Sequence, residues 1–366
     1  VIVNGKEWGP YEDASWPDFS SDGSAWGFVA EKADGKQYVI VNGKEWGPYE
    51  AASSPHFSSD GFAWGFEAEK ADGKRYLIVN GKEWGPYEYV DAFSPNFSSD
   101  GSAWGFVAEK ADGKRYLIVN GKEWGPYEYV SWPVFSSDGS AWGFAARNAD
   151  GKEYVIVNGK EWGPYEAASR PVFSSDGSAW GFVAEKADGK MSCLGLLLRP
   201  WADGKRYLIV NGEEWGPYES ASWPVFSSDG SAWGFWAEKA GGKWYLIVNG
   251  KEWGPYESAS RPHFSDRFAW GFWAEKAGLQ WSVIINGKEW GPYEDALSLP
   301  VFSSDGSTWV FVAEKADGKR YLILNGKEWG PYEYVDAFSP NFSSDGSAWG
   351  FVAEKADGKR YLIVNG

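Results

Sequence analysis

Residues 17–50 read PDFSSDGSAWGFVAEKADGKQYVIVNGKEWGPYE, and this stretch decides the fold. Asp-Gly or Asn-Gly pairs at Asp22, Asp34 and Asn42 separate four short segments rich in aromatic and β-branched residues. Such pairs tolerate the positive φ angles of type I′ turns and are the strongest short-range hairpin signal. We therefore expect three type I′ turns and a four-stranded antiparallel meander.

The same stretch recurs along the whole chain. Its Asn-Gly pairs lie 37 to 40 residues apart, except for one spacing of 53. The pairs begin at Asn4, Asn42, Asn80, Asn120, Asn158, Asn211, Asn249, Asn286, Asn325 and Asn365. Nine complete units lie between the first and the last pair, so residues 1–366 are expected to form one repeat domain.

The middle two segments of each unit carry apolar groups on both faces. Trp26 and Phe28 oppose Val29, so the sheet must be covered on both sides. Pro48 lacks a backbone N–H, which places the fourth segment at an edge. Identical sheets arranged radially cover one another without caps. The sequence therefore predicts an all-β fold, a single β-propeller of nine four-stranded antiparallel blades.

Other architectures stay open beside this one. A linear β-solenoid is the rival, although parallel β-helices favour shorter rungs without three hairpin turns per repeat. Propellers usually have four to eight blades, so an eight-blade ring with one splayed unit, or closure between chains, is a further alternative.

The unit resembles a known repeat. Pro-x-Phe-Ser-Ser-Asp-Gly followed by Ala-Trp-Gly-Phe-Val-Ala is similar to the TolB-type propeller repeat, a relative of WD repeats, and residues 78–83 look like its Val-Val-Asp-Gly-Lys-Glu. This chain departs from the pattern with Ser21 and Ser59 where the family has Pro, and with its many Trp residues. The resemblance implies an innermost Pro-x-Phe-Ser strand and an outermost Glu-Trp-Gly-Pro-Tyr strand. It also implies a periplasmic or extracellular interaction module, or an accessory domain of a peptidase, and carries over no site residues.

The first and the last segment of the chain are expected to have the same strand position in a closed ring. The sequence begins in mid-repeat at Val1 and looks excised from something longer. In a nine-blade ring, residues 7–11 would complete the last blade, which leaves residues 1–3 redundant with residues 362–364. We expect a monomer in which one of these two segments frays, or pairs with another molecule. Equal protection of both segments from hydrogen exchange in a monomer would contradict this.

Charge and composition limit the classes of partner and of site that the chain is expected to have. The net charge of −16 argues against a nucleic-acid or anionic-membrane partner and is otherwise explained by solubility or by a cationic partner. The single cysteine, Cys193, excludes an internal disulfide and a multi-thiolate metal site. No apolar run approaches the ~20 residues that span a bilayer.

Variation between the copies points to a candidate binding face. Glu-Trp-Gly-Pro-Tyr-Glu is identical in all nine units, whereas the residues on either side of the proline that opens the first strand differ. In a propeller these positions lie on one face near the central channel, on loops presented by a rigid scaffold. The candidate residues are Trp16, Asp18, His56, Asn96, Trp132, Arg170, Trp223, Arg261, His263 and Asn341. The other interpretation is drift, which the shared block at residues 89–96 and 334–341 favours.

Two further features of the sequence have both a functional and a structural interpretation. His56 and His263 occupy equivalent positions in units two and seven, too far apart to share a metal ion, and are interpreted as channel-lining residues. The insertion at residues 191–205 in the fifth unit contains a Leu-rich run. It is either an exposed docking patch or a tolerated by-product of repeat amplification.

No catalytic constellation stands apart from the repeat. Walker, dinucleotide-binding and Gly-x-Ser-x-Gly motifs are absent, and the carboxylates mostly recur in every unit, whereas a single active site needs asymmetry. We therefore expect a non-catalytic scaffold or protein-interaction module without cofactor or metal. The alternative is a multivalent lectin with sugar sites between blades, stacked on the fourth-strand Trp residues. Exposure of those Trp side chains would distinguish the two.

Overall fold

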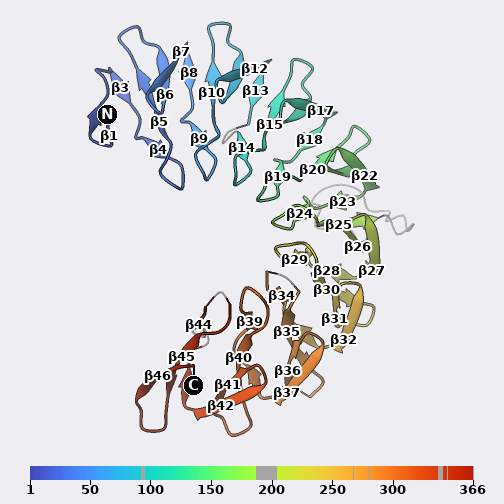
Figure 1. Ribbon diagram of the computed structural model, residues 1–366. Coiled ribbons are helices and arrows are strands. Elements are labelled where there is room, and N and C mark those ends of the chain that lie inside the picture. The colour runs from blue at the N-terminus through green and yellow to red at the C-terminus, as the bar shows by residue number, and fades with distance from the viewer. Residues whose placement is uncertain are drawn as a thin grey trace. The chain divides into compact units, whose positions relative to one another are not determined.

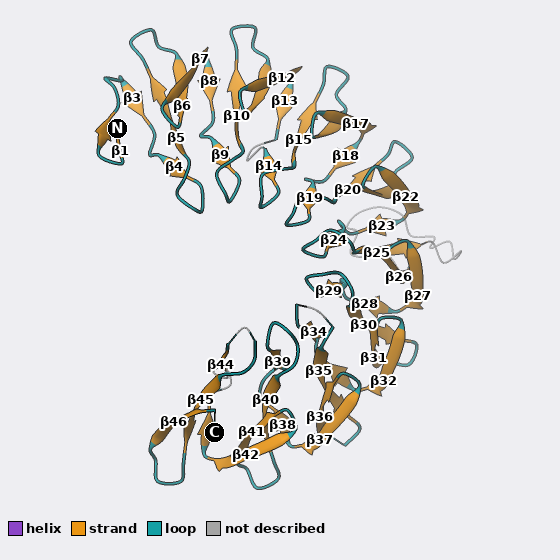
Figure 2. Ribbon diagram, viewed as in Figure 1, coloured by secondary structure: helices purple, strands orange, loops and turns teal. Residues whose placement is uncertain are grey.

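The computed structural model describes residues 1–91, 95–186, 204–266, 268–278, 280–336, 341–343 and 345–365. The chain divides into two compact units, Val1–Pro171 and Val172–Gly366. The described residues form strands and turns and no helix (Figure 2). The chain starts with a small hairpin in which β1 (Ile2–Val3) pairs with β2 (Lys6–Glu7).

Each repeat builds one antiparallel sheet around a central second strand. These second strands are β5 (Trp26–Glu31), β10 (Trp64–Glu69), β15 (Trp104–Glu109), β20 (Trp142–Arg147), β25 (Trp180–Lys186), β30 (Trp233–Lys239), β35 (Trp270–Lys276), β40 (Trp309–Glu314) and β45 (Trp349–Glu354). The third strands are β6 (Gln37–Val41), β11 (Arg75–Val79), β16 (Arg115–Val119), β21 (Glu153–Val157), β26 (Lys205–Val210), β31 (Lys243–Val248), β36 (Gln280–Ile285), β41 (Arg320–Leu324) and β46 (Arg360–Val364). The fourth strands are β7 (Lys44–Tyr49), β12 (Lys82–Tyr87), β17 (Lys122–Tyr127), β22 (Lys160–Tyr165), β27 (Glu213–Tyr218), β32 (Lys251–Tyr256), β37 (Lys288–Tyr293) and β42 (Lys327–Tyr332).

The first strand of each repeat is broken into two short pieces. The leading pieces are β3 (Asp13–Ala14), β8 (Ala51–Ala52), β13 (Tyr89–Val90), β18 (Tyr129–Val130), β23 (Ala167–Ala168), β28 (Ser220–Ala221), β33 (Ser258–Ala259), β38 (Asp295–Ala296) and β43 (Tyr334–Val335). The trailing pieces are β4 (Asp18–Phe19), β9 (His56–Phe57), β14 (Asn96–Phe97), β19 (Val134–Phe135), β24 (Val172–Phe173), β29 (Val225–Phe226), β34 (His263–Phe264), β39 (Val301–Phe302) and β44 (Asn341–Phe342).

Within the first unit the sheets lie side by side. Figure 1 shows β4, β9, β14 and β19 along one side of these sheets and the fourth strands along the opposite side. We call the side formed by the trailing pieces of the first strands, in each unit, the first-strand edge. The fold class predicted from the sequence is confirmed: the chain is all-β, built from repeated antiparallel sheets of four to five strands, as in a β-propeller. The number of blades in a closed ring stays a prediction.

The core lies between successive sheets, as the apolar pattern on both faces predicts. Val39, Val41 and Tyr49 of one sheet pack against Phe66 and Ile78 of the next. The second-strand Phe of every repeat is at most 1% exposed. Burying such a side chain contributes roughly 2 kcal/mol, and only when the neighbouring sheet is present to cover it. One repeat therefore depends on the next for its stability.

The turn prediction is right for one turn of each repeat and wrong for the other two. Asn42 and Gly43 have φ angles of 49° and 81°, the pattern of a type I′ turn. At the two Asp-Gly pairs only the glycine has positive φ, 71° at Gly23 and 70° at Gly35. The Gly35 N–H donates to the Lys32 carbonyl at 2.8 Å, and Asp34 Oδ1 accepts from the Lys36 N–H at 2.9 Å. These are four-residue turns ending in a left-handed glycine, in which the Asp acts through its carboxylate rather than through its backbone.

The break in the first strand is a β-bulge that the sequence analysis did not foresee. Ala14 faces Ala30 and Asp18 faces Gly27, so the first strand uses one more residue than its partner over this step. Pro17 lies inside the extra segment, where its missing N–H costs no ladder bond. The residues before the proline, expected in a connector loop, therefore belong to a bulged strand.

The fourth strand is an edge strand, as Pro48 predicts. The step from Trp46 to Tyr49 is one residue longer than the facing step from Gln37 to Val39, which places Gly47 and Pro48 in a bulge. The Gly-Pro peptide bond is cis in each of the nine copies.

At the ends, β1 pairs with β2 and β46 pairs with β45. Residues 8–11, expected to be part of a strand, are not in one. Completion of the last blade by the N-terminal strands stays a prediction. The Leu-rich part of the 191–205 insertion lies outside the described residues, and Lys205 begins β26.

Candidate functional site

A serine hydroxyl holds the variable residue before the proline in place. Ser131 Oγ donates to the Trp132 carbonyl at 3.1 Å and accepts from the Ala145 N–H of β20 at 3.0 Å. We call this arrangement the serine clip. Ser222 forms it before Trp223, with distances of 3.0 and 3.2 Å, and Ser260 forms it before Arg261, with distances of 3.1 and 3.2 Å. Different side chains are thus presented from the same backbone frame.

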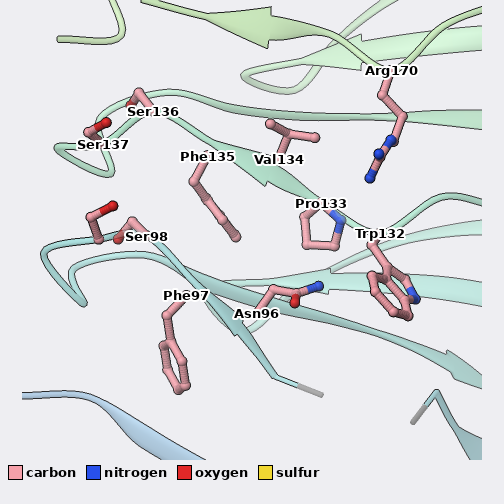
Figure 3. A pocket seen from close by; sticks show the side chains of 11 residues that line it. Asn96, Phe97, Ser98, Trp132, Pro133, Val134, Phe135, Ser136, Ser137 and Arg170 are labelled. Carbon is pink, nitrogen blue, oxygen red and sulfur yellow. The ribbon is translucent and has the colours of Figure 1, made fainter. Parts of the chain in front are cut away.

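Three of the predicted candidate residues line one open pocket on the first-strand edge of the first unit. Its volume is about 400 Å³, within the range of ligand sites. Asn96, Trp132 and Arg170 come from three successive repeats, and Figure 3 shows them around Pro133.

The rest of the pocket lining was not predicted from the sequence. Val134, Phe97 and Phe135 supply apolar surface, and Ser98 and Ser136 are among its hydroxyls. The Phe-Ser pair recurs in every repeat, so no sequence signal set it apart, and Val134 has the most frequent residue at its variable position. Asp91, which contacts the pocket residue Trp132, was also not predicted from the sequence.

Asp91 lies in the preceding repeat, and its Oδ2 accepts from the Trp132 Nε1–H at 3.0 Å. Trp132 nevertheless keeps 40% of its surface exposed. This hydrogen bond orients the indole while leaving part of the ring accessible from the pocket.

The Ser-Asp-Gly turns beside the pocket hold ionised carboxylates. Asp138 Oδ1 accepts from Ser136 Oγ at 2.7 Å and from Ser140 Oγ at 2.8 Å. The hydrogen bond from Ser136 and those from Ser140 keep the pKa of Asp138 below its ordinary value. The turn that supplies Ser136 and Ser137 to the pocket therefore has a negative charge.

The other candidates in the first unit do not join this pocket. Trp16 is 91% exposed, and Asp18 follows it on β4. His56 is half-buried on β9, where burial lowers its pKa and the charge of Asp18 raises it by less. These three residues lie on the same edge but line no common cavity with Asn96.

In the second unit, Trp223 is 52% exposed and Arg261 is also exposed. His263 lies on β34 and Asn341 on β44, both at the first-strand edge. Desolvation lowers the pKa of His263. Within the described residues, no three His, Cys, Asp or Glu side chains come together as a metal site.

The Trp residues of the fourth strands are partly buried, and each of those described below contacts a Trp of the next sheet and a lysine of its own strand. The Trp46 ring lies 5.2 Å from that of Trp64 in the next sheet, and Lys44 Nζ lies 4.1 Å from its centroid. Its Nε1 is buried and has no hydrogen-bond partner among the described residues. The rings of Trp84, Trp124, Trp253 and Trp290 have the same neighbours. A sugar could neither stack on such a ring nor accept from its N–H without displacing the protein's own groups.

Most lysines are neutralised by glutamates of the same sheet. Lys32 pairs with Glu45 and Lys36 with Glu50, each at 2.6 Å, and equivalent pairs recur in both units. Arg170 and Arg261 form no ion pair among the described residues, and neither do Arg115 or the fourth-strand lysines such as Lys44. Arg170 and Arg261 are the two cations of this kind at the candidate binding face.

The described residues include no helix long and apolar enough to cross a membrane.

Some solved structures resemble this chain in their fold. No protein-family model matches the chain, and no curated protein matches it. Solved structures that resemble it include the β-propeller domain of the Trilobed protease from Pyrococcus furiosus, at 14% identity over 90% of this chain and 98% of that one, with a TM-score of 0.32. TolB from Acinetobacter baumannii matches at 17% identity over 64% of this chain and 60% of that one (TM-score 0.25), and a eukaryotic initiation factor at 13% over 87% and 86% (TM-score 0.38). These likenesses concern the fold alone.

Proposed function

We propose that this protein is a non-catalytic binding scaffold that engages a protein partner through its first-strand edge. The observation that carries the proposal is the pocket of about 400 Å³ in which Asn96, Trp132 and Arg170 come from three repeats. These are positions where the copies disagree, whereas the surrounding frame is the same. A scaffold that varies its side chains only there is suited to recognition.

The composition of the pocket supports binding rather than catalysis. Its lining offers one amide, serine hydroxyls and one guanidinium. The carboxylates that accept from Ser98 and Ser136 belong to the Ser-Asp-Gly turns that recur along the chain, and a single active site needs asymmetry. The repeat is in keeping with TolB-type propellers, and we include membership of that group in the proposal.

The lectin alternative finds no support at the fourth-strand Trp residues, because they are partly buried and contact a lysine and the Trp of the next sheet. A glycan array decides this point: saturable binding at several equivalent sites would favour the lectin over the scaffold.

The test of the scaffold is partner capture by the full chain, with partners quantified by cross-linking and mass spectrometry. The double variant W132A/R170A should lose partners that the native chain retains. The control K36A removes an exposed Lys–Glu pair away from this edge and should retain them. Identical partner sets for native chain and double variant would refute the proposed surface.

A further inference from the structure

Two of the arginines that form no ion pair among the described residues, Arg170 and Arg261, occupy equivalent positions. Arg170 and Arg261 each precede the proline of the first strand, and Ser169 and Ser260 each donate to the arginine carbonyl at 3.1 Å. Arg115, Arg147 and Arg320 also form no ion pair among the described residues, so Arg170 and Arg261 are set apart by their shared position in the repeat. Two arginines at one position of the repeat indicate a recurring role.

Each arginine follows an exposed tryptophan on the preceding repeat. Trp132 stands 38 residues before Arg170, and Trp223 stands 38 residues before Arg261. The first pair lies wholly within the first unit and the second pair wholly within the second. Trp16 is the contrasting case, because the equivalent position in the next repeat is Ser54.

The first pair shows what such a site can hold. Trp132 and Arg170 share a pocket with the apolar Val134 and the amide of Asn96 (Figure 3). A guanidinium presents a planar fork that matches a carboxylate, and an indole beside it suits a flat or apolar group. The site therefore combines one positive charge with apolar surface.

The surrounding charge selects among anions. One guanidinium neutralises one charge, and the Asp91 carboxylate, which accepts from the Trp132 Nε1–H at 3.0 Å, places negative charge beside the same indole and opposes a second. A single carboxylate therefore fits better than a phosphate dianion. An exposed ion pair alone contributes only about 0–1 kcal/mol, so a small free acid would not be retained. A protein segment adds the apolar contact that the indole and valine require.

Resting on the proposed function, we propose that the first-strand edge binds acidic segments of a protein partner at two equivalent Trp–Arg sites, one in each unit. Each site takes an Asp or Glu carboxylate next to an aromatic or apolar residue. The position of Asn96 is occupied by Val172 in the second pair, so the first site has an extra amide donor and binds more tightly.

The probe is a fluorescein-labelled 12-residue peptide with a central Glu-Trp in a Gly-Ser background, titrated into the full chain. Parallel peptides carry Gln or phosphoserine in place of Glu. We expect two sites per chain for the Glu peptide, binding about two- to fivefold weaker for the Gln peptide, and weakening with salt.

The variants assign the sites. R170A should leave one site, R261A should leave the other, and R170A/R261A should remove both. R115A makes the same charge change on β16, away from this edge, and should bind like the native chain. W132A should weaken the first site about tenfold, whereas W16A should have no effect. Unchanged urea midpoints show that each variant is folded.

Equal affinity for the Glu and Gln peptides, preference for the phosphoserine peptide, or no saturation by about 1 mM peptide would overturn the inference. If the peptides fail in this way while W132A/R170A still loses captured partners, the acidic specificity is wrong and the scaffold stands. If that variant also keeps its partners, both proposals fall.

Discussion

Replacing Gly81 by alanine tests how successive sheets hold together. Gly81 closes the Asn-Gly turn between β11 and β12, and a Cβ built there would lie 2.5 Å from Trp46 Cη2 of the preceding sheet. Movement of the Trp46 ring is restricted, because Trp64 lies 5.2 Å away between ring centroids and Lys44 Nζ lies 4.1 Å from the Trp46 centroid. The alanine must therefore push the two sheets apart or force the turn to distort.

Two costs add at this position. Gly81 has a φ of 81°, and a left-handed alanine costs about 1–2 kcal/mol. Overpacking against a fixed ring costs a further ~1–3 kcal/mol. The control G73A separates them, because Gly73 has a φ of 72° and nothing within 4 Å of its hypothetical Cβ. We expect G81A to be less stable than G73A by about 1–3 kcal/mol, which is the contact term alone.

Urea denaturation followed by fluorescence measures both variants, and hydrogen exchange of the Ile78 and Val79 amides reports the local effect. Adding W46F, which lacks the outer ring atoms, should recover part of the loss in G81A and none in G73A. Equal stability of G81A and G73A, or full additivity of W46F with G81A, would show that the Trp–Gly contact does not set the spacing of the sheets.

Three further predictions concern single side chains. S131A leaves the buried Ala145 N–H without an acceptor, so we expect a loss of about 1–2 kcal/mol by urea denaturation; an unchanged midpoint would contradict the clip. Burial raises the pKa of Glu67 above its ordinary 4.5, so Glu67 stabilises the folded state in acid, and this stabilisation is lost as pH rises through the folded pKa. The E67V variant should therefore have a larger free energy of unfolding than the native chain at pH 7, by about 1 kcal/mol. At pH 4 this difference should vanish. The hydrogen bond from Ser343, and those from Ser347, lower the pKa of Asp345 to about 2, and an NMR titration that places it at 3.8 or above would disprove that turn geometry.

The sequence predicted the strands and the stacking because those depend on local pattern. Asn42-Gly43 adopts the predicted turn, since both residues have the positive φ it requires. Asp34-Gly35 does not, because the Asp carboxylate caps the Lys36 N–H and keeps its own backbone right-handed. Dipeptide identity alone does not distinguish these outcomes; the number of residues between the two strands does.

The candidate site was predictable only in part. Disagreement between the copies singled out Asn96, Trp132 and Arg170, but their convergence depends on the spacing of the sheets, which no single repeat encodes. Asp91 was missed because its role is to bind a side chain of the next repeat. The first-strand bulge was missed because Ser131 replaces a ladder bond with a side-chain bond, which strand patterns do not register.

The serine clip separates the identity of a residue from its position. Trp132, Arg170, Trp223 and Arg261 differ widely in size and charge, yet each is anchored by its main chain, so exchanging one for another disturbs no packing that the fold requires. Single substitutions at these positions can therefore change the binding specificity of the edge without passing through an unstable variant. For protein engineering, the edge offers a series of equivalent positions at which a chosen side chain can be introduced in each repeat.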